Sequence, residues 1–228
     1  MKIIYLIPPS EGKNKWWTHE SEQLSFILGK PSYIAQNVTS KDLHCKDKRY
    51  EEAIKLNHAL IEQTSDYTPA IQRYSWVMYN AIDYIGMSDQ ASKYFEGNFL
   101  ILSGMYGLVT PNDIIGNYKL PIWAKWLYKF WWDNLTRTLK DLQPDLVVNL
   151  LPQAYMKTID FHSLDTQVVH VAFMKYKDDA LVNMAHWVKK VKGEWIKNVC
   201  EKRLTHYNQF EWDMIEKDTE ITIQIIQK

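Results

Sequence analysis

The chain has 228 residues, a length typical of one α/β domain, and its 46% apolar content excludes a disordered chain. Its 27 basic and 27 acidic side chains balance, so the overall basic surplus of many nucleic-acid-binding proteins is absent. Cys45 and Cys200 are too few and too far apart for a disulfide scaffold, which predicts a reducing compartment.

The first predicted element is a buried strand over residues 3–7, a run of β-branched and aromatic side chains that ends at Pro8 and Pro9. This run is too short for the apolar core of a signal peptide, and no run approaches the roughly 18 apolar residues of a membrane span. We therefore predict a cytoplasmic protein with no membrane partner. Residues 14–50 show little periodicity and predict an irregular surface segment.

The rest of the chain alternates between helical and extended patterns. Apolar spacing and capping residues predict helices over residues 51–63, 68–82, 88–97, 121–142 and 193–204. Strands are predicted over residues 99–102, 145–151, 168–174, 180–188 and 220–226. Because strands and helices interleave, we expect a single α/β domain over residues 1–228, with a mixed sheet flanked by helices.

Polar residues follow the first predicted strand. Ser10, Glu11 and Lys13 stand at its carboxyl end, where open α/β sheets bind ligands. The segment is not a Walker phosphate loop, because Ile7 and Asn14 stand where that motif needs glycine and serine or threonine. The functional interpretation is a ligand-binding loop, and the alternative is a turn with solvated charges.

A second polar segment follows the strand predicted over residues 99–102. Ser103, Tyr106 and Asp113 lie in a stretch that also holds two glycines three residues apart, which permit close approach of the backbone to a ligand. We expect Ser103 and Tyr106 to face a ligand, with Tyr118 following in the same stretch. The alternative is a glycine-rich turn with a packed tyrosine.

A third segment is basic. Residues 189–203 hold six basic side chains against two acidic ones, a local excess that suits phosphate contact. It begins beside His186 and includes Lys189 and Lys192; the alternative is an ordinary solvated helix face. The seven histidines show no metal-binding spacing, so neither a metal site nor a cofactor is predicted.

In this order and spacing, the three segments resemble the YaaA family of bacterial peroxide-stress proteins. The similar positions are Leu6 to Lys13, Leu102 to Val109 with Pro111, Asp113, Ile115 and Tyr118, then Trp131, Asn149, Leu150, Ala154, Tyr155, His186, Lys189, Lys192, Gly193, Arg203 and Leu204. The resemblance spans residues 3 to 204. The chain departs from the family at Lys119, where an arginine is usual, and lacks the arginine that some members carry soon after the third strand.

The resemblance implies a YaaA-like domain with a basic cleft, in a cytoplasmic protein that binds DNA and limits damage linked to peroxide and free iron. It also implies a helix-hairpin-helix element, for which residues 82–91 are the best candidate. Ser88 stands where the second hairpin glycine is expected, so a plain turn between two helices is the alternative. Direct iron binding would need clustered ligands, which the spacing does not provide.

Two functions remain open at this point, and the sequence leaves the oligomeric state undecided. In a DNA-binding stress protein, the expected contacts are Ser10, Lys13, Ser103, Tyr118, Lys119, Asn149, His186, Lys189, Lys192 and Arg203. In an enzyme acting on a nucleotide, a nucleoside or a damaged base, the expected catalytic groups are Glu11, Lys13, Tyr106, Asp113 and Lys189.

Overall fold

The computed structural model describes residues 1–15, 25, 29–122, 125–177, 180–182, 185–202, 212–217 and 220–227. Its main sheet has eight strands in the order β4-β3-β1-β6-β7-β10-β9, with β8 paired to β7. These strands are β1 (Ile3–Ile7), β3 (Phe99–Ser103), β4 (Gly107–Val109), β6 (Leu146–Asn149), β7 (Gln167–Lys177), β8 (Ala180–Val182), β9 (Trp212–Lys217) and β10 (Glu220–Gln227).

The order of the parallel strands creates a switch point in the middle of the sheet. β1 pairs in parallel with β3 on one side and with β6 on the other, and β7 and β10 continue the parallel set. The chain therefore runs from β1 to β3 in one direction and then crosses back over β1 to reach β6. In doubly wound sheets, ligands bind outside the carboxyl ends of the two strands at such a point.

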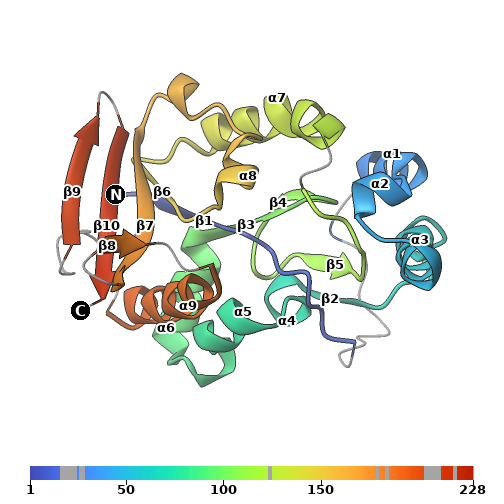
Figure 1. Cartoon of the computed structure of the whole chain (residues 1–228), viewed down its shortest axis with the longest axis horizontal. Helices are drawn as coiled ribbons and strands as arrows, with labels where there is room; N and C mark the ends of the chain where they lie inside the picture. The colour runs from blue at the N-terminus through green and yellow to red at the C-terminus, as the bar shows by residue number, and fades with distance from the viewer. Residues whose placement is uncertain are drawn as a thin grey trace.

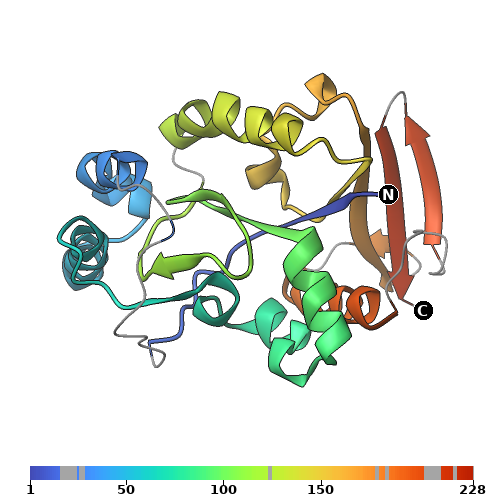
Figure 2. The same cartoon turned by 180° about the vertical axis from the view of Figure 1, so that it is seen from behind.

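Helices cover both faces of this sheet (Figure 1). In both views, α5 (Val77–Ile82), α6 (Asp89–Asn98) and α9 (Ala185–Lys202) lie on one side of β1 and β3, and α7 (Lys125–Leu142) and α8 (Gln153–Met156) lie on the other (Figure 2). The mixed sheet flanked by helices confirms the predicted α/β class.

A smaller part lies beyond the β4 edge of the sheet (Figure 1). It contains α1 (Gly29–Asn37), α2 (Ser40–Leu43), α3 (Asp47–Ile61), α4 (Ala70–Arg73) and the antiparallel pair β2 (Tyr67–Pro69) and β5 (Ile114–Gly116). Single 3-10 turns cover Tyr84–Gly86 and Phe161–Ser163. None of the helices in the described ranges combines the length and apolar character that crossing a membrane requires.

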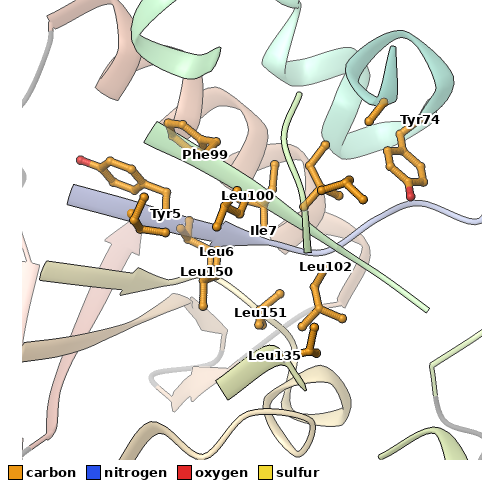
Figure 3. Packing of buried hydrophobic residues seen from close by; sticks show 14 of the residues in the cluster. Tyr5, Leu6, Ile7, Tyr74, Phe99, Leu100, Leu102, Leu135, Leu150 and Leu151 are labelled. Carbon is orange, nitrogen blue, oxygen red and sulfur yellow. The ribbon is translucent and has the colours of Figure 1, made fainter. Parts of the chain in front are cut away.

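The core forms where β1 and β3 pack between the helix layers. Figure 3 shows Leu6 and Ile7 of β1 among side chains from β3, α7 and the segment after β6. Leu6 and Ile7 have no exposed surface, and the Tyr5 ring stacks on Phe99 with 4.5 Å between centroids. Burying one such side chain stabilises the fold by about 1.5–3 kcal/mol. This packing fixes β1, and with it the start of the loop that follows.

The structure corrects three of the predicted segments. Residues 14–50, expected to be irregular, hold α1, α2 and the start of α3, whose buried faces are too short to produce a clear period. The helix predicted over residues 68–82 is β2, α4 and α5, because residues 67–69 pair with β5 and residues 74–76 interrupt the helical backbone.

The third correction concerns the end of the chain. The strand predicted over residues 180–188 ends at Val182, and α9 already begins at Ala185. β9 was not predicted at all, whereas β10 lies where expected and pairs in parallel with β7.

Candidate functional site

The loop at residues 10–13 is fastened to the segment between α4 and α5. Ser10 Oγ donates a hydrogen bond to the Gly12 carbonyl at 2.5 Å and accepts one from the Ser75 amide at 3.0 Å. The Ser75 amide also donates to the Gly12 carbonyl, and the Asn14 amide donates to the Arg73 carbonyl. Ser10 therefore shapes the loop, and residues 73–75 hold it in place.

A cavity of about 720 Å³ opens at the carboxyl ends of β1 and β6, where the strand order places the switch point. We call it the switch-point cavity. It is lined by Pro8, Pro9, Ser10, Glu11, Ser75 to Tyr79, Asn149, Leu151 to Met156, His170 to Phe173, Val188, Lys189 and Lys192.

Two lysines of α9 reach this cavity. Lys192 is 7% exposed, donates from Nζ to the Leu150 carbonyl at 2.5 Å, and lies 5.8 Å from the Phe173 ring centroid. Burial lowers the pKa of Lys192 to about 8. Lys189, one turn earlier, is exposed at the rim. A buried and an exposed ammonium group on one wall suit an anionic ligand.

Asn149 and His170 form an oriented polar pair on the sheet side of the same cavity. The Leu151 amide donates to Asn149 Oδ1 at 3.0 Å, which fixes the side-chain amide with its nitrogen toward His170. Asn149 Nδ2 lies 2.7 Å from His170 Nδ1 and donates to it. In the neutral imidazole, this bond places the ring proton on Nε2.

Trp76 stands between α4 and α5 in a backbone conformation that is unusual for its residue type. Its φ of 77° and ψ of −169° fall in a region that is essentially restricted to glycine. Its side chain is 58% exposed and lies so close over Gly12 that a Cβ there would overlap the indole. Such strain costs on the order of 1–3 kcal/mol and concentrates at functional sites.

A second cavity of about 630 Å³ adjoins the first. Both are lined by Pro9, Ser10, Glu11, Trp76 and Tyr155, so these residues form the boundary between them. We call the second one the lysine cavity, because three lysines and an arginine contribute to its lining. Its remaining residues are Lys13, Lys15, Leu43, His44, Cys45, Arg49, Glu52, Ala53, Leu56, Tyr118, Lys119, Leu120 and Pro121.

Lys13 places its ammonium group among aromatic rings. Its Nζ lies 4.2 Å from the Tyr118 ring centroid and 5.7 Å from that of Tyr74, and it donates to the Ser10 carbonyl at 3.2 Å. Glu11 forms its ion pair with Lys119, at 3.1 Å. Burial, together with repulsion from Lys119, lowers the pKa of Lys13 to about 7.

Three hydroxyl groups connect beneath Lys13. Tyr118 Oη lies 2.8 Å from both Tyr74 Oη and Ser103 Oγ, and burial raises the pKa of Tyr118 well above its usual value. Ser103 Oγ also accepts hydrogen bonds from the amides of Met105 and Tyr106. Ser103 therefore acts through Tyr118 and lies outside the lining of both cavities.

The other polar residues of the second segment occupy supporting positions. Tyr106 is buried, and its hydroxyl accepts a hydrogen bond from the Gly116 amide at 3.1 Å. Asp113 accepts one from the Thr110 amide at 2.6 Å and closes the turn before β5. Both side chains lie outside the lining of the two cavities.

The structure thus gathers most of the predicted site residues along one continuous pair of cavities. The residues brought together are Ser10, Glu11, Lys13, Tyr118, Lys119, Asn149, Lys189 and Lys192. His186 belongs to α9, but its side chain is outside the described part of the structure, and Arg203 lies outside the described residues altogether. Our sequence interpretation did not include Trp76, which falls off the apolar stripe of residues 71–82 and could have been recognised as an exposed aromatic residue.

The candidate hairpin at residues 82–91 links α5 to α6 beside α9. Ser88 caps α6, and its amide and hydroxyl groups donate to the Glu201 carboxylate at 3.0 and 2.8 Å. Asp83 has a left-handed φ of 46° and pairs with Lys197 at 2.6 Å. The carboxylates of Asp83 and Glu201 therefore lie at this turn. That residues 82–91 contact DNA as a helix-hairpin-helix element stays a prediction.

Within the described ranges, no three residues among His, Cys, Asp and Glu come close enough together to hold a metal ion.

Comparisons with known proteins place the chain in a family. A UPF0246 protein of Lactiplantibacillus plantarum is 31% identical over 195 residues, which cover 80% of this chain and 76% of that protein. One of Saccharophagus degradans is 26% identical over 79% of this chain and 77% of its own length. One of Colwellia psychrerythraea is 29% identical over 61% of this chain and 59% of its own length. The family model described as peroxide stress protein YaaA matches residues 3–214, and the chain belongs to this family.

Proposed function

We propose that this protein acts in the cytoplasmic response to peroxide stress by binding DNA, and that the switch-point cavity receives an unstacked base. Family membership supports the link to peroxide stress. The observation that carries the binding proposal is Trp76, an exposed indole in a strained conformation between two cavities with lysines on their walls.

An exposed indole is a surface on which a base can stack. Base–aromatic stacking contributes about 1–3 kcal/mol per base and tolerates any base. Lys189 at the rim and Lys192 inside the cavity are placed to hold the flanking phosphates. Because a base must leave the duplex to reach Trp76, we expect tighter binding to single-stranded or unpaired DNA than to a perfect duplex.

The neutral overall charge limits how many phosphates the protein can neutralise. Because the binding surface is local, we expect the two cavities to contact roughly two to four phosphates. Each contacted phosphate releases about 0.9 counterions or fewer. The logarithm of the affinity should therefore fall with the logarithm of salt concentration with a slope of about −1.4 to −3.6.

Fluorescence anisotropy with labelled single-stranded, bubble and duplex oligonucleotides tests this proposal. Trp76→Ala should weaken binding to bubble DNA about tenfold, the equivalent of ~1.4 kcal/mol, and should affect duplex binding less. Trp132→Ala is the matched control, since Trp132 is 41% exposed on α7 and lies outside both cavities. Undetectable binding to all three DNA forms at low salt would reject the proposal.

The second candidate function is an enzyme that acts on a nucleotide, a nucleoside or a damaged base. The oriented Asn149–His170 pair favours it, because a cavity that only held phosphates would not need an amide and an imidazole. In this case Asn149→Ala should abolish turnover of the substrate while the protein still binds it. Absence of turnover across a panel of nucleotides, nucleosides and oligonucleotides with damaged bases would leave binding alone.

A further inference from the structure

We propose that Lys13 forms an imine with an aldehyde that neighbours a phosphate group. The ring-opened deoxyribose of an abasic site in DNA and a free aldehydic sugar phosphate share this chemistry. An abasic DNA substrate rests on the proposed function, whereas a free sugar phosphate substrate does not depend on DNA binding.

The surroundings of Lys13 favour a reactive amine over a structural ion pair. Burial and the nearby Lys119 disfavour its ammonium form, and the carboxylate of Glu11 pairs with Lys119. The Tyr118 ring and the Ser10 carbonyl hold Nζ in position. An amine near neutral pH attacks a carbonyl only in its uncharged form. With a pKa of about 7, a large fraction of Lys13 is uncharged at physiological pH. An ordinary lysine is almost fully protonated at this pH.

The lysine cavity has room and charge for the rest of such a substrate. Its volume of about 630 Å³ exceeds the size of a sugar phosphate, and Lys15, Arg49 and Lys119 line it. These cations can hold a phosphate while the aldehyde carbon approaches Lys13 Nζ. The shared boundary with the switch-point cavity lets a DNA strand pass along Trp76 from one cavity to the other.

The reaction balances without an external oxidant or reductant. The lone pair of Lys13 Nζ attacks the aldehyde carbon, and one amine proton moves to the carbonyl oxygen to give a carbinolamine. Loss of that oxygen as water, with a second proton from the nitrogen or solvent, leaves the imine. The side chains of Lys119 and Glu11, which line the same cavity, can transfer these protons.

Reduction with borohydride tests the proposal, because hydride converts the imine into a stable secondary amine. The protein is incubated with an oligonucleotide that carries one abasic aldehyde, or separately with deoxyribose 5-phosphate, and the adduct is located by peptide mass spectrometry. We expect the adduct at Lys13 and a rate that rises through about pH 7 and then levels off. Adducts spread over other lysines, or no adduct with either substrate, would overturn the proposal.

Lys13→Arg separates reaction from binding, because it keeps the charge but cannot form an imine. We expect this variant to lose at least tenfold more in adduct yield than in affinity for a tetrahydrofuran abasic analogue, which has no aldehyde. Lys140→Ala is the control, since Lys140 is exposed on α7 away from both cavities. Binding of the analogue without trapping would reject only the imine, whereas trapping of deoxyribose 5-phosphate without any DNA binding would reject only the DNA function.

Discussion

Trp76 and Lys192 each occupy a position where we expect another residue to stabilise the folded protein more. Trp76 occupies backbone angles that suit glycine. Lys192 has a buried ammonium group, because only 7% of the residue is exposed. Both side chains line the switch-point cavity. Residues that reduce stability in this way are expected at sites selected for binding, so both positions offer tests in which stability and function move in opposite directions.

Trp76→Gly should be more stable than Trp76→Ala by about 1–2 kcal/mol, because only glycine adopts these backbone angles without strain. Both variants should bind unpaired DNA equally poorly, since both lack the indole. Urea denaturation of the two variants, followed by anisotropy with a bubble oligonucleotide, measures both effects. Equal stability of the two variants would contradict the strain argument.

The pH dependence of stability should reveal the burial of Lys192. Its folded-state pKa of about 8 lies below the usual value of 10.5, so the unfolded chain holds more protons between these limits. Wild-type stability should therefore rise relative to Lys192→Met as the pH increases from 8 to 10, by about 2 kcal/mol. Below about pH 7 the difference between the two proteins should stay constant.

Urea midpoints at a series of pH values measure this difference. Lys140→Met serves as the control, because the exposed Lys140 on α7 should show the same difference from wild type at every pH. A Lys192→Met difference that does not change between pH 8 and 10 would show that Lys192 is not desolvated.

The sequence predicts part of the site at this scale, for a physical reason. Ser10 and Lys13 lie in the loop after the buried strand β1, and Asn149 is the last residue of β6. Parallel strands bring residues at their carboxyl ends to one edge of the sheet. Trp76 could not be placed in the same way, because its position depends on the break between α4 and α5. That break arises from hydrogen bonds between residues 73–75 and the loop after β1, a contact across about sixty residues of chain.

At the scale of elements, the junction of α5 and α9 decides how the two walls of the switch-point cavity meet. α5 begins next to Trp76, and α9 carries Lys189 and Lys192. The two helices approach closely at Gly193, where a Cβ would overlap the Met78 carbonyl and lie 2.7 Å from the Ala81 Cβ. Glycine at this position lets the two backbones touch.

Gly193→Ala should lower the free energy of unfolding by about 1–3 kcal/mol, because the added methyl group forces α5 and α9 apart. It should also weaken DNA binding, since the lysines of α9 move away from Trp76. Gly97→Ala is a matched control on α6, where nothing lies within 4 Å of the added Cβ. This second variant should be stabilised by about 0.5–1 kcal/mol. Equal effects of the two substitutions in urea denaturation would contradict the close-packing argument.

Elements with a continuous buried apolar run or a clear helical period were predicted from the sequence, and elements with few buried residues were not. β1, β3, β6 and α7 follow directly from such patterns. α1 buries only Pro31, Ile34 and Ala35, and α2 is four residues long, so neither carries enough pattern to be recognised. Their formation depends on packing against α3 and on the capping box of Thr39 and Asp42.

For the whole molecule, β10 is an interior strand although it comes last in the described chain. It pairs with β7 over eight residues and with β9 on its other side. A chain shortened to residues 1–202 would leave β7 as an unpaired edge, which favours association between molecules. We expect this truncated protein to aggregate and to lose its cooperative urea transition, as light scattering and circular dichroism would show.

Removal of Lys228 alone is the control for this truncation, because it leaves β9 and β10 intact. A truncated protein that stays monomeric and unfolds at the wild-type urea concentration would show that the sheet is complete without its last two strands.

The central place of β1 has a consequence for synthesis on the ribosome. β1 is made first, but its two neighbours in the sheet, β3 and β6, begin only at Phe99 and Leu146. At about 5–20 residues per second, the nascent chain exposes this apolar strand for roughly 5–20 s before its first partner appears. The strand that leads into the loop at residues 10–13 must therefore stay shielded from other chains until residues 99–103 have been made.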